Sequence, residues 1–394
     1  MSIFRTLFSL KRNSLSLWER VGVRAKLKTL NNIYISRENI LNNFDIFQKL
    51  HPEWDIFPVL KSNAYGHGIR EIANILKERK IKYIAVDSYF EALKIWEVSN
   101  VKILIIGYSM LENLSKMNFK KTSLVVYDLG TLEELARIGK PVNIHLKLDT
   151  GMHRQGIYIE DLPFFLEFIK KHKNINLEGV VTHFADADSV DNSYSIFQEK
   201  LFKQGIDIIK NAGFNPKYIH SDNSAASVKG FGKNVCNSLR LGISLYGVNP
   251  LEPDDKYFEK LKNLKLALTF NSTLILKKDI KKGENVSYNC TFEAPQDMTI
   301  GIIPVGYYEG LSRKLSSNFQ FYFKNSPLPI LGRVCMNLTI VDISGLEVNV
   351  GDRIEIISDN LSKNNNIYKM AERSETIPYE CFTRLSETIR REII

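Results

Sequence analysis

Eight short apolar segments alternate with amphipathic segments over about 190 residues of this chain. The apolar segments have the length of strands, and between them apolar residues recur every three or four positions, as in a helix packed on one face. Each parallel strand needs a crossover to reach the next, and eight such units close a ring. The predicted fold is therefore α/β, a (β/α)₈ TIM-type barrel with strands at Phe57–Ser62, Tyr83–Asp87, Lys102–Tyr108, Leu124–Tyr127, Val142–Asp149, Leu177–Phe184, Tyr218–Ser221 and Ser238–Tyr246.

The pattern changes after Pro250, where strand-like segments follow one another with turn signals between them. This is typical of a second, mainly antiparallel β domain. A chain of 394 residues is long enough for both units, and we place the barrel at 29–255 and the β domain at 256–394. Within the second unit we expect strands in Leu264–Lys278, Glu284–Phe292, Met298–Val305, Phe319–Phe323, Arg333–Ile343 and Asp352–Ile357, a loop at Asn360–Asn366, and a short helix with a tail at Ile377–Arg391.

The net charge of +9 is concentrated at the amino end of the chain. Residues 1–28 contain seven lysines and arginines against one glutamate, a balance of +6, which leaves only +3 for the other 366 residues. We therefore expect residues 1–28 to form a basic, disordered extension. The folded body is close to neutral, and we expect it to bind no nucleic acid.

Two further observations concern the environment of the chain. It contains no run of about 18 apolar residues, which excludes a membrane-spanning helix. Its four cysteines, Cys236, Cys290, Cys335 and Cys381, are scattered and form no C-x-x-C pair. That spacing predicts neither a metal site nor a disulfide scaffold, and it favours a reducing compartment, the cytoplasm.

Polar residues gather where the barrel strands are expected to end. In a barrel of this type the active site lies at the carboxyl ends of the strands. The residues expected there are Lys61, Ser62 and Asn63 after the first strand, Lys147, Asp149 and Arg154 after the fifth, Thr182 and His183 after the sixth, Ser221, Asn223 and Ser224 after the seventh, and Arg240 on the eighth.

Lys61 is the most informative of these residues because it directly follows the apolar pair Val59-Leu60. An ammonium group is costly to keep charged in apolar surroundings, and such a lysine is a candidate imine-forming nucleophile. The alternative is a lysine that simply reaches solvent from the end of a strand. The number of polar partners expected nearby favours the chemical interpretation.

The segment Lys61-Ser-Asn-Ala-Tyr-Gly-His-Gly68 resembles the pyridoxal phosphate lysine motif of the alanine racemase family. Further matches follow in order at His145–Arg154, Thr182–Phe184, Asn223-Ser224, Arg240–Ile243, Val286–Tyr288, Gly306-Tyr307 and Cys335-Met336. The resemblance implies a barrel followed by a β domain, pyridoxal 5′-phosphate as cofactor, and a homodimer with shared active sites. It also implies the interconversion of L-alanine and D-alanine for peptidoglycan.

The chemistry of racemisation explains why such residues are needed. The α-proton of an amino acid is too weakly acidic for a side-chain base alone, which contributes only about 10²–10⁴-fold. Pyridoxal phosphate supplies an electron sink. Inversion also requires two acid/base groups on opposite faces of the cofactor, and by resemblance these are Lys61 and Tyr288.

The resemblance implies roles for the other matching residues. Arg240 faces the pyridine nitrogen, where a group that keeps its proton limits delocalisation and favours reprotonation. Arg154 lies near the phenolic oxygen of the cofactor and the substrate carboxylate, and Lys147 matches a lysine that is carbamylated in many members. The remaining roles are the cofactor ring for His183, the phosphate for Tyr65, Ser224, Gly242 and Ile243, and the substrate entrance, from the second subunit, for Tyr307 and Met336.

The chain departs from the family pattern at several positions. The common Cys-Met-Asp-Gln is Cys335-Met336-Asn337-Leu338 here, and Gly-Tyr-Ala-Asp-Gly is Gly306-Tyr307-Tyr308-Glu309-Gly310. Asn289 replaces the usual glycine after Val-Ser-Tyr. Glu387 is expected where some members place a phosphate-binding tyrosine. The first two departures border the substrate entrance, so strict specificity for alanine is the property they put in question.

Three alternatives therefore stay open beside alanine racemisation: a racemase of another or broader range such as serine or lysine, a non-catalytic pyridoxal phosphate-binding protein, and a fold-related amino-acid decarboxylase. The Val286–Tyr288 match argues against the last two, because neither needs this second base. Asp149 has two interpretations as well, since it could orient Lys147 or merely end its strand.

Overall fold

The eight predicted barrel strands are all present in the computed structural model, which describes residues 28–394. They are β2 (Asp55–Pro58), β3 (Tyr83–Val86), β4 (Lys102–Ile105), β5 (Thr122–Val126), β6 (Val142–Lys147), β7 (Ile175–Val181), β8 (Tyr218–His220) and β9 (Ser238–Leu241). Strands β3 to β8 form one parallel sheet in chain order, and β2 pairs with β9. The predicted extension at residues 1–28 lies outside the described residues except for Lys28.

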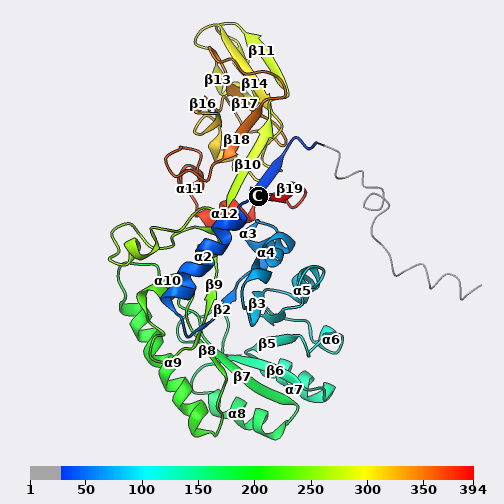
Figure 1. The fold of residues 1–394 in the computed structure, drawn as a ribbon, viewed down its shortest axis with the longest axis vertical. Helices are drawn as coiled ribbons and strands as arrows, with labels where there is room; N and C mark the ends of the chain where they lie inside the picture. Colours follow the sequence, from blue (N-terminus) through cyan, green and yellow to red (C-terminus); the bar gives the residue numbers. More distant parts are fainter. Residues whose placement is uncertain (1–27) are drawn as a thin grey trace, which may run out of the picture.

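Hydrogen bonds beyond the strand limits close the ring. The Leu60 N–H donates to Ala85 O over 2.8 Å, which joins the end of β2 to β3, and the Arg240 N–H donates to Asp222 O over 2.9 Å, which joins β9 to the segment after β8. Helices cover the outside of the ring (Figure 1). The barrel prediction is confirmed, although the strands are shorter at their carboxyl ends than the sequence pattern indicates.

Helices occupy the connections, as the periodicity predicts. In α7 the Asp128 carboxylate accepts from the Thr131 N–H over 2.8 Å at the start, and Gly139 ends the helix with φ +69°. The helices of the barrel unit are α2 (Arg37–Leu50), α3 (Lys61–Tyr65), α4 (Ile69–Ile75), α5 (Tyr89–Trp96), α6 (Leu111–Leu114), α7 (Leu129–Ile138), α8 (Leu162–Lys171), α9 (Ser193–Asn211) and α10 (Ser224–Lys229).

The second unit is mainly antiparallel, as predicted. A six-stranded sheet has the order β16-β15-β18-β10-β1-β19, a three-stranded sheet the order β11-β14-β17, and β12 pairs with β13. The strands are β1 (Asn32–Ile35), β10 (Leu268–Thr273), β11 (Leu276–Ile280), β12 (Asn285–Val286), β13 (Phe292–Glu293), β14 (Met298–Ile303), β15 (Gln320–Phe323), β16 (Ser326–Pro329), β17 (Thr339–Asp342), β18 (Arg353–Ile357) and β19 (Arg390–Ile393).

Three strand predictions in this unit need correction. The segment 264–278 divides into β10 and the start of β11, and 284–292 divides into β12 and β13 around a single turn, Tyr288–Cys290. In 333–343 only β17 is a strand, because the Cys335 N–H donates to Leu338 O over 3.0 Å and closes a turn there. The loop at 360–366 is present, and α11 (Ile367–Ser374) and α12 (Pro378–Thr383) follow it.

Both ends of the described chain meet in the six-stranded sheet. β1 pairs antiparallel with β10 and parallel with β19, although β1 precedes the barrel in sequence. β1 was not predicted from the sequence, and a tail was predicted where β19 lies. The domain boundary near residue 255 stays a prediction. β1 lies in the sequence range predicted for the barrel but belongs to a sheet of the β domain.

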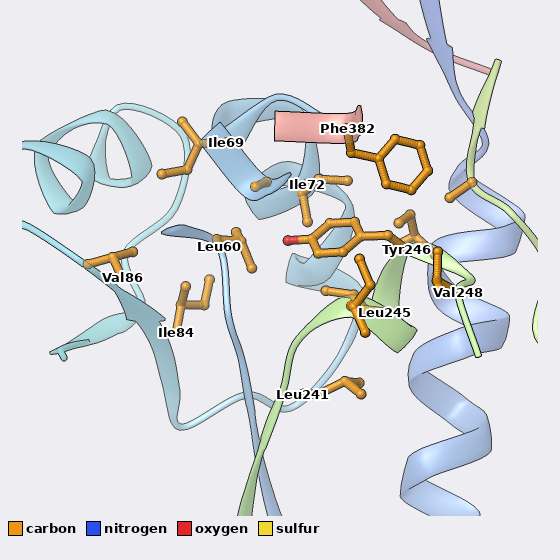
Figure 2. Packing of buried hydrophobic residues seen from close by; sticks show 14 of the residues in the cluster. Leu60, Ile69, Ile72, Ile84, Val86, Leu241, Leu245, Tyr246, Val248 and Phe382 are labelled. Carbon is orange, nitrogen blue, oxygen red and sulfur yellow. The ribbon is translucent and has the colours of Figure 1, made fainter. Parts of the chain in front are cut away.

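One hydrophobic cluster runs through both units. Tyr246 is fully buried at its centre, with its hydroxyl donating to Val59 O over 2.8 Å. Figure 2 shows Leu60 and Ile72 from the barrel on one side and Phe382 of α12 above the tyrosine. α12 is therefore packed onto the barrel beside α3, at the junction of the two units.

Among residues 28–394, no helix combines the length and apolar character needed to cross a bilayer. In the same range, no group of three or more His, Cys, Asp or Glu side chains is arranged to hold a metal ion.

Candidate functional site

A cavity of about 670 Å³ opens at the carboxyl ends of the barrel strands. Of the twelve residues to which the resemblance assigns a role, it brings together nine, Lys61, Tyr65, Lys147, Arg154, His183, Ser224, Arg240, Gly242 and Ile243. The other three, Tyr288, Tyr307 and Met336, do not line it. They lie in the β domain with exposed fractions of 65%, 45% and 55%.

Lys61 does not end a strand, as the sequence pattern indicates, but begins the short helix α3. β2 stops at Pro58, and the four residues after Lys61 have φ values between +51° and +55°. A left-handed turn costs about 1–2 kcal/mol per non-glycine residue. Surrounding contacts must therefore hold Ser62 to Tyr65 in this conformation.

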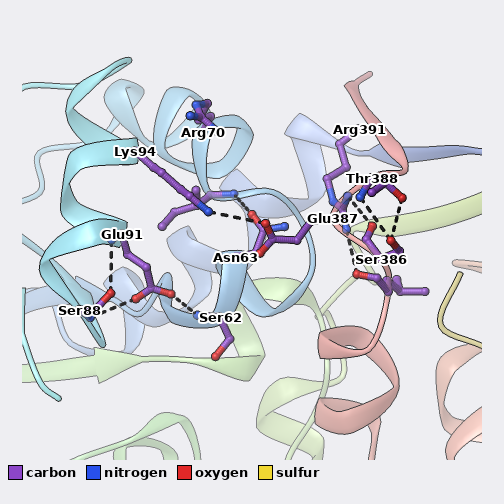
Figure 3. Close-up of polar contacts among 12 residues, drawn as sticks. Ser62, Asn63, Arg70, Ser88, Glu91, Lys94, Ser386, Glu387, Thr388 and Arg391 are labelled. Atoms are coloured by element: carbon purple, nitrogen blue, oxygen red, sulfur yellow. Dashed lines mark hydrogen bonds and ion pairs between the residues drawn. The ribbon is translucent and has the colours of Figure 1, made fainter. Parts of the chain in front are cut away.

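The Glu91 and Arg391 side chains reach the turn from α5 and β19, and Asn63 adds a contact from within it (Figure 3). The Glu91 carboxylate accepts from the Ser62 N–H over 2.6 Å, and the Asn63 side chain accepts from the Ile69 N–H over 2.9 Å. Arg391 of β19 donates to Gly66 O over 2.9 Å. A Cβ at Gly66, where φ is +79°, would lie 2.0 Å from Phe382 O, so this close approach requires glycine.

Arg240 is buried and surrounded by neutral acceptors. Its guanidinium donates to the carbonyl oxygens of Thr182, His220 and Ser221, each over 2.8 Å. It also lies 2.8 Å from Nδ1 of His220 and 3.0 Å from Nδ1 of His183. Burial lowers the pKa of Arg240 to about 10, so the group stays charged at neutral pH.

His183 is held neutral beside this arginine. Burial and the charge of Arg240 place the pKa of His183 well below its ordinary value. An arginine can only donate, so Nδ1 of His183 accepts and its proton is on Nε2.

Lys147 lines the cavity close enough to Arg154 for the two charges to interact. Its Nζ donates to Oε1 of Gln155 over 2.9 Å, and burial, followed by the charge of Arg240, lowers the pKa of Lys147 to about 8. Asp149 does more than end a strand, and its charge partly offsets the lowering of the Lys147 pKa. Its carboxylate accepts from the N–H groups of Gly151 and His153 and so shapes the loop that carries Arg154.

Two hydroxyl groups of the cavity lie close to Gly242. The Ser224 hydroxyl accepts from the Gly242 N–H over 3.1 Å, and burial raises the pKa of Tyr65 to about 12, so its hydroxyl stays protonated. A Cβ at Gly242 would lie 3.1 Å from the Tyr65 hydroxyl and 3.9 Å from that of Ser224. The glycine thus keeps open the space between two hydroxyl donors.

Tyr379 of α12 also lines the cavity, with its ring centroid 6.2 Å from that of Tyr65. The expectation for Glu387 is therefore corrected. Glu387 does not line the cavity and forms an exposed ion pair with Lys94 at 3.6 Å, whereas a tyrosine does reach the hydroxyl cluster from eight residues earlier. Tyr379 lies in the segment 377–391 that was predicted as a short helix with a tail, so a tyrosine was present there in the sequence as a candidate for this position.

Several other residues that line the cavity were not predicted. Asp87 ends a predicted strand and Gln155 directly follows Arg154, so their places in the sequence indicate that both are near the site. The sequence around Asp188, Glu380 and Thr383 contains no such indication.

Tyr307 and Met336 lie on adjoining loops of the β domain. The Tyr307 N–H donates to Cys335 O over 3.0 Å, and the Tyr308 N–H donates to Met336 O over 2.9 Å. Two of the departures from the family pattern contact each other here, because the Asn337 amide donates to the buried Glu309 carboxylate over 2.9 Å. Tyr288 is on the separate turn between β12 and β13.

Comparison with known families gives matches to both units. The family model described as "Alanine racemase, N-terminal domain" matches residues 35–250, and "Alanine racemase, C-terminal domain" matches residues 267–393.

Individual relatives agree with the family models. The chain is 32% identical over 376 residues to an alanine racemase of Borreliella burgdorferi, covering 92% of this chain and 96% of that protein. It superposes with a TM-score of 0.86 and 29% identity on the alanine racemase of Bacillus anthracis with bound L-Ala-P, over 93% and 96% of the two chains. The Bartonella henselae alanine racemase with covalently bound pyridoxal phosphate shares the fold, with a TM-score of 0.82 at 23% identity over 93% and 100% of the chains.

Proposed function

The chain belongs to the alanine racemase family, and from this premise we propose that it interconverts L-alanine and D-alanine with pyridoxal 5′-phosphate as cofactor. Members of this family are pyridoxal phosphate-dependent isomerases. The observation that carries the proposal is the meeting of Lys61, Arg240 and the hydroxyl cluster in a single cavity.

The residues present fit the cofactor. A cavity of about 670 Å³ lies within the range of about 300–1,000 Å³ typical of small-molecule sites. The space that Gly242 keeps open is bordered by the hydroxyls of Tyr65 and Ser224, which suits a phosphate group. We propose that the phosphate is held by Tyr65, Tyr379, Ser224 and the backbone of Gly242 and Ile243. His183 would pack beside the cofactor ring, and Lys61 would bind the aldehyde carbon of the cofactor.

When bound, the cofactor withdraws electron density from the substrate α-carbon, which no side chain here provides. With the cofactor bound, the Lys61 amine would hold it and would take or return the α-proton on one face. Arg240 would act as a charged donor towards the ring nitrogen and so disfavour its protonation. Arg154 binds the substrate carboxylate.

The second base is the hydroxyl of Tyr288, which within one chain lies outside the cavity. We propose a homodimer in which the β domain of one chain covers the barrel mouth of the other. Tyr288, Tyr307 and Met336 of each chain then complete the partner's site. Their exposure in the single chain supports this arrangement.

Replacing Arg240 by glutamate should change the reaction rather than only slow it. A carboxylate stabilises a proton on the ring nitrogen where a guanidinium opposes it. We expect racemisation to fall by at least about tenfold and transamination, a side reaction, to rise. Alanine-to-pyruvate conversion is measured beside the chiral assay, and unaltered values for both would place Arg240 away from the ring.

We also propose that Lys147 carries a carbamate that orients Arg154. Only the neutral amine reacts with carbon dioxide, and a pKa of about 8 leaves about half of Lys147 neutral at pH 8. Carbamate occupancy should therefore rise between pH 6 and pH 9. The measurement is the ¹³C NMR signal after equilibration with ¹³C-bicarbonate, which Lys147→Gln should abolish and Lys173→Gln, at an exposed lysine, should retain.

A chiral assay tests the function itself. The protein is incubated with pyridoxal phosphate and L-alanine, and D-alanine and carbon dioxide are both measured. D-alanine without carbon dioxide supports racemisation, carbon dioxide indicates a decarboxylase, and neither product indicates a cofactor-binding protein. Parallel incubations with L-serine and L-lysine test whether the Asn337 and Leu338 departures broaden the substrate range.

We further propose that the product D-alanine supplies peptidoglycan synthesis and that the protein acts in the cytoplasm. Support comes from the family assignment and from the free cysteines among the described residues.

A further inference from the structure

We propose that Glu178, a partly buried residue of β7, is a positioning residue for Arg240 and acts through a buried chain of two histidines. The chain runs from Arg240 through His220 and His145 to Glu178. The proposal rests on the function proposed above, because it concerns the residue assigned to the cofactor ring nitrogen.

The hydrogen bonds of this chain can point in only one direction. Arg240 can only donate, so Nδ1 of His220, 2.8 Å away, is an acceptor. Burial lowers the pKa of both histidines, so each is neutral and carries one proton. His220 therefore donates from Nε2 to Nδ1 of His145 over 2.7 Å. His145 must in turn donate from its Nε2.

The acceptor of that last proton is Glu178, whose Oε2 lies 3.4 Å from Nε2 of His145. The same carboxylate accepts from the hydroxyls of Tyr83 and Ser123, each over 2.8 Å. Although burial opposes ionisation, the hydrogen bonds from His145, Tyr83 and Ser123 lower the pKa of Glu178 to about 2. An obligate donor at one end and an ionised acceptor at the other thus fix both histidine tautomers.

The backbone of β7 is shaped to make this contact. Ile144 pairs with Leu177 and His145 with Gly179, so Glu178 is the extra residue of a β-bulge. Bulges re-aim a side chain, and this one directs Glu178 at His145. The next residue has to be glycine, since a Cβ at Gly179 would lie 2.4 Å from Nδ1 of His145, in the space that the imidazole occupies.

The two histidines connect Arg240 by hydrogen bonds to a carboxylate, which none of its direct hydrogen-bond partners provides. Every acceptor in direct contact with the guanidinium is neutral. The buried carboxylate of Asp222 acts on Arg240 only through its charge, which partly offsets the lowering of the Arg240 pKa by burial; its hydrogen bonds go to the Ser221 hydroxyl and the Gly232 N–H. Hydrogen bonds in a chain polarise one another, so the charge of Glu178 strengthens the bond between His220 and Arg240. This holds the guanidinium in a single orientation towards the cavity.

The proton positions provide a test that does not depend on activity. Neutron diffraction of the holoenzyme should show a proton on Nε2 and none on Nδ1 in both His145 and His220, with Glu178 ionised. A proton on Nδ1 of either ring, or a doubly protonated ring, would overturn the proposal. This readout also separates the two inferences, because a wild-type protein that fails to racemise alanine leaves the proton positions measurable.

Two variants of Glu178 separate charge from hydrogen bonding. Glu178→Gln keeps an acceptor and loses the charge, whereas Glu178→Leu loses both. We expect kcat to fall in both, by about 10- to 100-fold in the leucine variant, with KM changed by less than about twofold. The ring ¹⁵N signals of labelled histidine should stay those of the Nε2 tautomer in the glutamine variant and become mixed in the leucine variant.

Gly179→Ala provides an independent perturbation, because the added methyl displaces the His145 ring and should lower kcat in the same way. Its matched control is Gly130→Ala, where the added carbon meets nothing closer than 3.5 Å. The control for charge is Glu133→Gln, on the exposed face of α7. Glu178→Leu with wild-type kcat and wild-type histidine signals would overturn the proposal, whether or not Gly179→Ala folds.

Discussion

Replacing Lys61 by alanine should lower the rate of alanine racemisation by at least about 10⁴-fold in both directions. The substitution removes the amine that holds the cofactor and one of the two groups that move the α-proton, and loss of general base catalysis alone costs about 10²–10⁴-fold. The rate is measured by the chiral assay with L-alanine and, separately, with D-alanine. Lys173→Ala, an exposed lysine outside the cavity, is the matched control and should leave the rate unchanged.

Borohydride reduction followed by peptide mass spectrometry identifies the lysine involved. In the wild type the cofactor should be fixed to Lys61, and in Lys61→Ala no peptide should carry it. Cofactor fixed to another lysine of the wild type would contradict the assignment. A Lys61→Ala protein with the activity of its control would do so as well.

The Tyr288→Phe substitution should lower racemisation by about 10²–10⁴-fold in both directions, because inversion requires proton removal on one face and delivery on the other. Folding should be nearly unaffected, since the tyrosine is 65% exposed in the single chain and surface substitutions shift stability by only about 0.5 kcal/mol. The thermal midpoint and the chiral assay measure the two effects separately.

Tyr308→Phe is the matched control for this substitution, because Tyr308 is also an exposed tyrosine of the β domain. It should keep most of the activity. Equal activities of Tyr288→Phe and Tyr308→Phe would remove Tyr288 from the chemistry while leaving the role of Lys61 intact.

The barrel could be predicted because its signal is local. Each strand is a short apolar run and each helix has its own periodicity, so eight repeats identify the ring without any knowledge of long-range contacts. The strand ends were less predictable. The apolar run through Val59 and Leu60 continues to Lys61, but the chain leaves the sheet after Pro58 and turns left-handed. Asn63 tolerates left-handed backbone, but Ser62, Ala64 and Tyr65 carry no signal for such a turn.

The contacts that hold this turn were also beyond local pattern. Arg391 reaches Gly66 across 325 positions of sequence, and Tyr379 approaches Tyr65 from the far end of the chain. Such contacts arise only because β19 pairs with β1 and so brings the carboxyl end to the barrel. Site residues that directly follow barrel strands could be predicted from the sequence. Those contributed by α12, such as Tyr379, became evident only from the folded structure.

Mixing two inactive variants tests the shared site most directly. Lys61→Ala and Tyr288→Phe proteins are each prepared alone, combined under conditions that exchange subunits, and assayed for racemisation. In a mixed dimer one site inherits both substitutions and the other receives an intact Lys61 from one chain and an intact Tyr288 from its partner. Random re-association makes about half of the dimers mixed, so activity should approach about a quarter of that of the wild type. Activity that stays at the level of the separate variants, with subunit exchange demonstrated by mass spectrometry, would contradict an active site assembled from two chains.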